Sequence, residues 1–341
     1  MDMYQNIDQL ARSLHQESVD IRRTMHMYPE TGWFEMRTSA IITKRLTELG
    51  YEVLTGRQVC REDTRMGVPS PEELEAHYQQ LPEQGTPMEY VTEDMREGFT
   101  GVIGILRCGD GPVAALRFDI DALPMTENAT QDHRPFREGF ASRNPGCMHA
   151  CGHDSHIAMG LGTAKVLSEI REHLHGTVKL VFQPAEEGAR GAKGIAASGH
   201  MDDVDFFAAT HIAPDDTIDD GDITPGTYGS LATAKLDVEF HGKAAHAGGF
   251  PEKGCDALQA AAHAAIALAG IPRHSGGMSR VNVGTLRGGS GRNVVPDYAF
   301  MQVEVRGETT EITQYMTVRA CAICEAAPAL TGCTASVSIV G

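Results

Sequence analysis

The sequence predicts an α/β fold in two domains, and three observations support this. Apolar runs typical of β-strands alternate with segments of helical periodicity between residues 100 and 212. Around 217–229 the composition shifts to Asp, Thr, Gly and Pro, which indicates a domain boundary. Beyond it the elements follow in the order β-α-β-β-α-β. We therefore expect a mixed or parallel sheet flanked by helices, then a smaller α+β domain of ferredoxin-like arrangement.

Two helices and a strand are expected first. Apolar residues recur at helical spacing over 7–27, and Pro29 closes this helix because proline disfavours its continuation. A second helix is expected over 38–49 and a strand over 51–54. Residues 56–98 are polar and punctuated by prolines, so we expect an inserted excursion outside the core.

The remaining elements continue the alternation of strands and helices. In the first domain we expect strands at 101–107, 113–118 and 177–182, and a helix at 160–170. In the second domain we expect strand 234–240, helix 256–269, strand 279–286, strand 298–306, helix 311–326 and strand 335–340. The second set predicts helices packed on one antiparallel sheet.

Charge and composition restrict the possible functions. The chain carries 29 Lys+Arg against 46 Asp+Glu, a formal net charge of −17, which disfavours nucleic-acid binding but not a small anionic substrate. Its eight cysteines are scattered without a paired framework, and the N-terminus lacks a secretory signal. The most apolar stretch, 255–271, is too short to span a bilayer. We expect reduced thiols, a cytoplasmic location, no membrane and no nucleic-acid partner.

The densest cluster of chemically active side chains is 148–156, with three histidines, a cysteine and an aspartate. Cys151 and His153 stand two apart around a glycine, so in an irregular turn both side chains can face one point. Imidazole and thiolate are ligands that zinc and similar ions select. A divalent metal site is therefore favoured over the alternative, a polar turn with incidental histidines.

Glu186 and Glu187 follow the apolar strand 177–182, at the end of a strand where open α/β sheets bind ligands. Because adjacent side chains diverge, one glutamate can bind metal while the other acts on water as a general base. Surface positions are the alternative for such a pair. The buried strand before them and the glycine after them disfavour that alternative.

Two further apolar runs end in polar side chains. His211 lies near the end of 206–212, and such a histidine taken alone is more often structural than a ligand. With the other clusters also at strand ends, it becomes a candidate ligand. The run 115–124 adds acidic residues at a fourth strand end, suited to orient metal-binding imidazoles.

Five segments resemble motifs of the metal-dependent amidohydrolases of the aminoacylase type, a metallopeptidase family. These segments are 118–124, 148–154, 183–188, 244–248 and 291–296. The family includes aminoacylases, carboxypeptidases that release glutamate and hydrolases of indole-acetyl amino acids. The resemblance implies a discontinuous catalytic domain, interrupted by an inserted lid and dimerisation domain.

The resemblance also implies roles for residues of the first domain. Two divalent ions, manganese or zinc, are implied as cofactors. Their implied ligands in this sequence are Cys151, His153, Glu187 and His211. Glu186 would be the general base, taking a proton from water and passing it to the leaving amine. Asp121 would be an orienting carboxylate, and an ordinary strand-end acid is the alternative.

In the second domain, three residues match the family's lid. His246 resembles the histidine that reaches the active site of the neighbouring subunit, where it stabilises the oxyanion. Asn293 and Arg306 resemble the residues that bind the substrate's carboxylate, a group that the guanidinium fork suits. The alternatives are a turn residue for Asn293 and a surface charge at a strand end for Arg306.

Two further segments, 56–69 and 133–142, are similar to family members that cleave p-aminobenzoyl-glutamate. This implies hydrolysis of that amide to p-aminobenzoate and glutamate, in folate catabolism. The partners implied are a small acyl-amino acid substrate and a second subunit, in a homodimer or a heterodimer with a related B subunit. Other N-acyl or indole-acetyl amino acids are alternative substrates, and a non-catalytic subunit is the alternative from another class.

The family pattern sets the expected domain limits. Residues 1–226 would be catalytic, 227–336 the lid and dimerisation domain, and 337–341 the start of a return to the catalytic domain. In the family that return supplies further strands, helices and one more histidine ligand, which have no counterpart here. We therefore expect a fragment or a truncated protein, with low activity, an exposed strand edge and exposed apolar surface.

Overall fold

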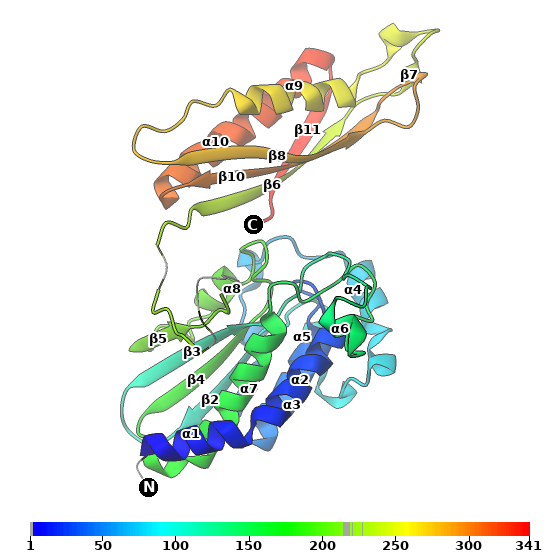
Figure 1. Ribbon diagram of the computed structural model, residues 1–341. Helices are drawn as coiled ribbons and strands as arrows, with labels where there is room; N and C mark the ends of the chain where they lie inside the picture. The colour runs from blue at the N-terminus through cyan, green and yellow to red at the C-terminus, as the bar shows by residue number, and fades with distance from the viewer. Residues whose placement is uncertain (1–2, 214–218, 220, 227) are drawn as a thin grey trace. The chain divides into compact units, whose positions relative to one another are not determined.

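Residues 3–213, 219, 221–226 and 228–341 are described by the structure, a computed structural model. The chain divides into two units, Met1–Ile218 and Asp219–Gly341 (Figure 1). The boundary predicted at 226/227 adjoins residue 227, which lies outside the described residues. No helix in the described part of the chain is long and apolar enough to cross a membrane.

The first unit is built on a five-stranded sheet in the order β1-β2-β4-β3-β5. β2 pairs antiparallel with β1 and β4, whereas β3 runs parallel to β4 and β5. The strands are β1 (Glu52–Thr55), β2 (Val102–Arg107), β3 (Val113–Asp119), β4 (Thr177–Gln183) and β5 (Phe206–Ala209). The predicted mixed sheet is therefore confirmed.

Helices pack against both faces of this sheet. Leu180 and Phe182 point to the face covered by α2, α3 and α7, whereas Val181 points to the other face and packs with Ile195 of α8. The helices are α1 (Met3–Ser13), α2 (His15–Met27), α3 (Met36–Glu48), α4 (Pro71–Tyr78), α5 (Glu93–Arg96), α6 (Arg134–Arg137), α7 (His153–Glu169) and α8 (Ala192–Ala196). The packing of helices on both faces holds the strands in place, and the candidate site lies at the ends of these strands.

Two expectations for the N-terminal part were wrong in detail. The helix predicted over 7–27 is two helices that meet at Leu14; α2 buries Met25 and His26, whereas α1 has no buried residue. The segment 56–98, predicted to lie outside the core, buries Val59, Leu81 and Met95 completely. A polar segment can do this because single apolar residues, spaced along its short helices, each reach inward.

The second unit contains a four-stranded antiparallel sheet in the order β11-β6-β10-β8. Leu236, Val238 and Phe240 alternate along β6 and pack with α9 and α10, so both helices cover one face. The elements are β6 (Ala232–His241), β7 (Ala245–His246), α9 (Ala257–Ala269), β8 (Ser279–Gly288), β9 (Val294–Val295), β10 (Tyr298–Gly307), α10 (Thr310–Ala326) and β11 (Thr334–Ile339). The predicted β-α-β-β-α-β order is observed.

The segment 337–341 does not begin by leaving the second unit. Residues 337–339 belong to β11 and pair with 236–238 of β6. Val337 packs against the core beneath α9 and α10, so an apolar residue inside an alternating run keeps this strand in the second sheet. The predicted return to the first domain is therefore corrected for these three residues.

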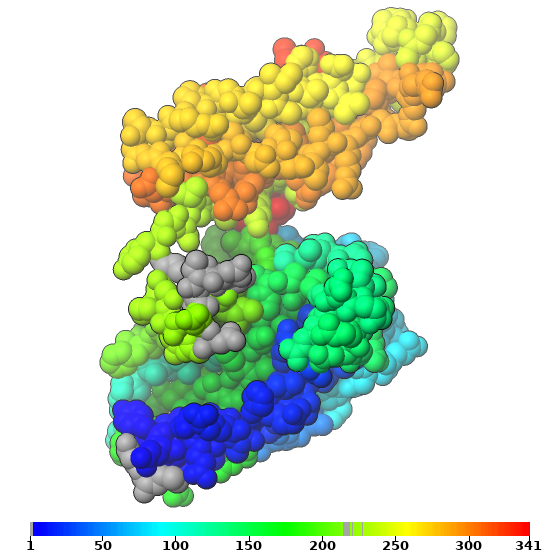
Figure 2. Space-filling view, in the orientation of Figure 1, coloured from blue at the N-terminus to red at the C-terminus, as the bar shows by residue number. Residues whose placement is uncertain are grey.

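β5 is the last strand at one edge of the first sheet. Its Phe206 and Phe207 are 65% and 59% exposed. An apolar groove of about 660 Å³ lies beside it, lined by α1, α2, α7, β3 and β5. Figure 2 shows α1 and α2, in blue, along the surface of the unit. The predicted strand edge and apolar surface are thus both present.

Candidate metal centre

Three neighbouring strands, β4, β3 and β5, bring polar side chains to one edge of the first sheet. Because these strands run parallel, their carboxyl ends lie together. Asp119 is the last residue of β3, Glu186 and Glu187 follow β4, and His211 follows β5. The edge therefore collects acidic and imidazole groups that lie far apart in the sequence.

The cysteine–histidine pair reaches the same edge from the start of α7. Gly152 precedes this helix at φ +81°, a left-handed conformation that favours glycine. A methyl group added there would collide with Cδ1 of Ile212. This turn leaves Cys151 before the helix and makes His153 its first residue. The irregular turn predicted for both residues is therefore observed for Cys151 alone.

The imidazoles of His153 and His211 each have one nitrogen held by a backbone carbonyl. Nδ1 of His153 donates to the carbonyl of Asp121 at 2.8 Å, and Nδ1 of His211 donates to that of Ile212 at 2.6 Å. With its proton on Nδ1, a neutral ring presents the lone pair of Nε2, as metal-binding histidines do. Nε2 of His211 lies 3.5 Å from Sγ of Cys151.

Cys151, His153 and Glu187 offer ligand atoms that lie within 4.8 Å of one another. Burial and the Glu187 carboxylate raise the pKa of Cys151 to about 12. Burial, Glu186 and Asp121 raise the pKa of Glu187. Burial alone would lower the pKa of His153, but the hydrogen bond to Asp121 and the nearby carboxylates raise it to about 9. A cation at this point would relieve the crowding of anionic groups.

The residues at this edge fit a divalent metal. A thiol, two imidazoles and a carboxylate are ligand types that zinc accepts, and carboxylates also admit manganese. Nε2 of His153 is buried and has no hydrogen-bond partner within the described residues. Leaving such an atom unsatisfied costs about 1–3 kcal/mol. A metal ligand would satisfy it.

Glu186 stands beside these donors. Its Oε2 lies 3.9 Å from Nε2 of His153, and its side chain is 38% exposed. The backbone N–H of the next residue, Glu187, donates to Oδ2 of Asp121 at 2.9 Å. Asp121 thus contacts His153 through its carbonyl and through Oδ1, which lies 3.4 Å from Nδ1, while its Oδ2 contacts the glutamate loop. A carboxylate that is open to solvent next to the donors can reach water, as a general base must.

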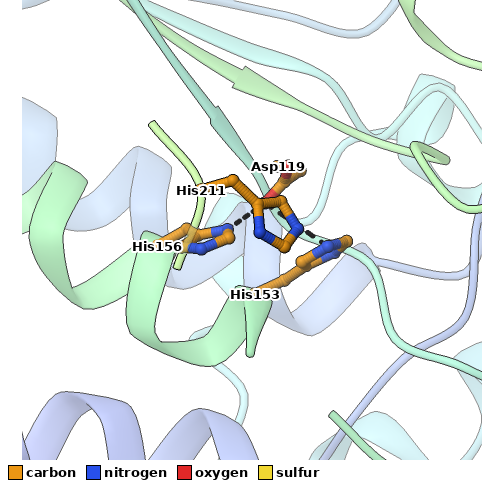
Figure 3. A group of neighbouring side chains, drawn as sticks. All are labelled: Asp119, His153, His156 and His211. Atoms are coloured by element: carbon orange, nitrogen blue, oxygen red, sulfur yellow. Dashed lines mark hydrogen bonds and ion pairs between the residues drawn. The ribbon is translucent and has the colours of Figure 1, made fainter. Parts of the chain in front are cut away.

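His156 was not assigned a role from the sequence, and Asp119 was included only as one of the acidic residues of 115–124, yet both lie among the candidate ligands (Figure 3). The N–H of Ile212 donates to Nε2 of His156 at 2.9 Å, which leaves the proton on Nδ1 for a hydrogen bond to Asp119. Arg117 holds the other Asp119 oxygen at 2.6 Å. Both nitrogens of His156 are therefore engaged, and it fixes the loop that carries His211.

One sequence signal could have identified His156. It follows His153 by three positions, and residues three apart on a helix lie on the same face. Asp119 was part of the acidic strand end that the sequence singled out, but its pairing depends on the fold. Distance in sequence hides the pairing of Asp119 with His156, 37 positions away, because strand and helix meet only in the folded unit.

Comparison with known sequences decides the family. Residues 115–318, more than half of the chain, match peptidase family M20/M25/M40. The chain belongs to this family. It is 46% identical over 336 residues to an indole-3-acetyl-aspartic acid hydrolase of Enterobacter agglomerans, covering 98% of this chain and 76% of that protein. It is 45% identical over 317 residues to the A subunit of p-aminobenzoyl-glutamate hydrolase from Escherichia coli, covering 93% and 72%.

Solved structures of M20 relatives agree with this membership. An aminobenzoyl-glutamate utilization protein of Klebsiella pneumoniae superposes with a TM-score of 0.81 at 39% identity, covering 98% of this chain and 78% of that chain. A dinuclear metal-binding M20 peptidase of Bacillus subtilis gives a TM-score of 0.55 at 28% identity, covering 96% and 74%. The chain is a hydrolase that acts on amide bonds, with a mixed α/β fold and a candidate metal site.

Two of the three residues predicted from the second domain are neighbours in this M20 chain. His246 in β7 pairs with Val294 in β9. The N–H of Ala247 donates to the carbonyl of Asn293 at 3.0 Å. His246 and Asn293 therefore lie together in a two-stranded arm.

Arg306 lies apart from that arm. The strand β10 begins at Tyr298, shortly after β9 of the arm, and Arg306 lies eight positions further along it. At ~3.3 Å per residue this is roughly 26 Å of strand. Its guanidinium donates to the carboxylate of Glu304 at 2.9 and 3.0 Å. Arg306 thus lies toward the opposite end of the sheet, and a substrate carboxylate would have to compete with Glu304 for it.

Proposed function

We propose that this chain hydrolyses the amide bond of p-aminobenzoyl-glutamate to p-aminobenzoate and glutamate. The observation that carries the proposal is the convergence of metal-ligand side chains, with one glutamate beside them, at the carboxyl ends of parallel strands. Two relatives support the substrate class. Their names specify p-aminobenzoyl-glutamate and indole-3-acetyl-aspartic acid, each an aromatic acyl group joined to an acidic amino acid.

We propose that two divalent ions, manganese or zinc, are held at this edge of the first sheet. The ligands in this proposal are Cys151, His153, Glu187 and His211. The bound ions supply polarisation of the scissile carbonyl and a lowered pKa for water. Support comes from the anchored imidazoles and from the buried Nε2 of His153, which makes no hydrogen bond within the part of the chain that the structure describes.

Glu186 handles the proton in this proposal. Its carboxylate accepts the proton that the attacking water loses and later delivers it to the departing amine nitrogen. Asp121 keeps that carboxylate in place, because its own carboxylate accepts the N–H of Glu187. The partly exposed side chain of Glu186, next to His153, supports a role as base for Glu186 and as metal ligand for Glu187.

The second unit is proposed as a lid and dimerisation domain. His246 and Asn293 share one arm, whereas Arg306 lies toward the far end of the sheet, so one copy cannot easily direct all three into one pocket. We propose that His246 and Asn293 serve the site of a neighbouring subunit, where His246 stabilises the oxyanion. Arg306 would bind a substrate carboxylate.

The proposed assembly is a homodimer or a heterodimer with a related B subunit. One relative is named as the A subunit of its hydrolase and another as a homologue of that protein, which supports a second subunit. We also propose a cytoplasmic location. All eight cysteines are free thiols, which supports a reducing compartment.

Indole-3-acetyl-aspartic acid is the second candidate substrate. The relative of that name is 46% identical to this chain and the p-aminobenzoyl-glutamate hydrolase relative is 45% identical, so overall identity does not separate the two. Both substrates present an amide and an acidic amino acid to the same catalytic groups. Their acyl groups differ in size and shape, so the pocket around the aromatic ring decides between them.

The test is a substrate panel with the purified protein loaded with Mn²⁺ or Zn²⁺. Release of the amino acid is measured from p-aminobenzoyl-glutamate, indole-3-acetyl-aspartate and hippurate, with and without a chelator. We expect the highest kcat/KM for p-aminobenzoyl-glutamate and loss of turnover on chelation. A higher kcat/KM for indole-3-acetyl-aspartate would favour the second candidate. Metal-loaded protein that cleaves none of the three would contradict the proposal.

A further inference from the structure

A fully buried carboxylate, Glu35, lies behind the loop that carries Glu186 and Glu187. Its Oε1 accepts the backbone N–H of Ala185 at 2.7 Å, and its Oε2 accepts the hydroxyl of Thr100 at 2.6 Å. The carbonyl of Thr100 in turn accepts the hydroxyl of Ser39. Glu35 is therefore held at one side and contacts the glutamate loop at the other.

Ala185 is the residue at which this loop turns. Its φ is +48°, a left-handed conformation in which residues other than glycine are strained, and its side chain is fully buried. Its carbonyl accepts the N–H groups of Arg190 and Gly191 at 3.1 and 2.8 Å. Such a turn persists only where the surroundings fix it, and the bond from its N–H to Glu35 is part of that fixation.

The peptide N–H groups on either side of Glu186 both end on buried carboxylates. The N–H of Ala185 donates to Glu35, and the N–H of Glu187 donates to Asp121. We propose that Glu35 is a positioning residue, which, opposite Asp121, sets the directions of the Glu186 and Glu187 side chains through the N–H of Ala185. This inference rests on the proposed roles of those two glutamates.

The electrostatics of Glu35 argue against a purely packing role. Burial, and then the charge of Asp121, raise the pKa of Glu35 to about 8. Burying a carboxyl group is unfavourable unless its hydrogen bonds are needed, and an apolar side chain of the same size would fill the space at lower cost. The oxygen that accepts the Ala185 N–H is therefore the feature that a carboxyl or a carboxamide supplies here and an apolar side chain does not.

The test compares Glu35→Met with Glu35→Gln. Methionine fills the space but cannot accept the Ala185 N–H. The glutamine amide oxygen can accept it, while its NH₂ group donates to the Thr100 hydroxyl oxygen. Glu30→Met is the matched control, because Glu30 is also a buried carboxylate but accepts the N–H groups of Arg37 and Thr38 at the start of α3.

Three readouts separate positioning from folding. The first is hydrogen exchange at the backbone N–H of Ala185, the second is Mn²⁺ affinity by competition with a chelating dye, and the third is kcat against KM. For Glu35→Met we expect faster exchange, Mn²⁺ affinity lower by about 10–100-fold and a lower kcat with little change in KM. For Glu35→Gln we expect values within about threefold of the unmodified chain, because both hydrogen bonds are retained.

The inference would be overturned if Glu35→Met kept the hydrogen-exchange rate at the Ala185 N–H and the Mn²⁺ affinity of the unmodified chain. It would also be overturned if Glu30→Met accelerated exchange at the Ala185 N–H as much as Glu35→Met does. If Glu35→Met does not fold, Thr100→Val keeps the test open, because it removes one anchor of Glu35 without touching the loop. It should then accelerate exchange at Ala185, and an unchanged rate would contradict the inference. Exchange and metal affinity need no substrate, so a wrong substrate proposal would leave these results valid.

Discussion

At the scale of single residues, the carbonyl oxygens behind His153 and His211 prepare these side chains for a metal. Each carbonyl holds the Nδ1 proton, so that the ring of His153 can offer Nε2 near Cys151 and Glu187, and Nε2 of His211 lies 3.5 Å from Sγ of Cys151. A free histidine ring would have to choose a tautomer and an orientation on binding. Here both choices are made by the fold, which lowers the entropy lost when the ligands gather.

Replacing Glu186 by alanine tests the division of labour between the two glutamates. We expect kcat to fall by about 10²–10⁴-fold, the usual contribution of a general base, while metal content stays unchanged. Turnover and metal per chain are measured on the same preparation, with Glu172→Ala as an exposed-glutamate control. Retained turnover would refute the assignment of the base, and lost metal would make Glu186 a ligand.

Metal binding should release protons and strengthen as pH rises. The pKa of His153 is raised to about 9 and that of Cys151 to about 12, so both groups hold protons near pH 7 in the metal-free protein. An ion that takes both as ligands must displace roughly two protons, so the apparent affinity increases with pH below about 9. Calorimetry in two buffers of different ionisation enthalpy measures the number released. An affinity that stays constant between pH 6 and 8 would contradict the proposed ligands.

The candidate metal ligands were marked in the sequence more clearly than the residues that surround them. Polar clusters and strand ends drew attention to Cys151, His153, Glu187 and His211, the family resemblance implied that they are ligands, and the structure places them near one another. Glu35 lies in no such cluster and at no such strand end, so the sequence did not single it out. It contacts a loop 150 positions away, and only the fold reveals that its neighbour is Ala185.

At the scale of elements, the turn before α7 determines how Cys151 and His153 face the same point. Gly152→Ala would add strain at φ +81° and a collision with Ile212, so we expect metal affinity to fall by about tenfold or more. Gly146→Ala is the matched control, because Gly146 has φ +77° but open space around its added methyl. That control should lose about 1–2 kcal/mol of stability and keep its metal. Equal metal affinity in both variants would show that the turn does not position the ligands.

Elements with a clear periodic pattern were predicted closely, and those defined by tertiary packing were not. α9 and α10 bury one apolar stripe each, so their sequences specify them. The break at Leu14 could not be predicted from the sequence, because no proline or glycine lies near it. The burial of Val59, Leu81 and Met95 depends on partners elsewhere in the first unit, which a local pattern does not identify.

At the scale of the whole molecule, the separation of His246 from Arg306 within the second unit favours sites shared between subunits. The proposal predicts that Glu186→Ala and His246→Ala chains, each inactive alone, regain activity when mixed and allowed to exchange subunits. A mixed dimer would contain one site with both residues intact, so random exchange restores about a quarter of the unmodified activity. Activity is measured before and after mixing, and the absence of any recovery despite exchange would place both residues in the site of one chain.

The proposed hydrolysis depends on a divalent metal held at the carboxyl ends of β4, β3 and β5. The most direct measurement is anomalous diffraction from crystals of the protein grown with Zn²⁺ or Mn²⁺. We expect two anomalous peaks about 3.5–4 Å apart within ligand distance of Cys151, His153, Glu187 and His211. Metal-saturated crystals without an anomalous peak at these side chains would contradict the account.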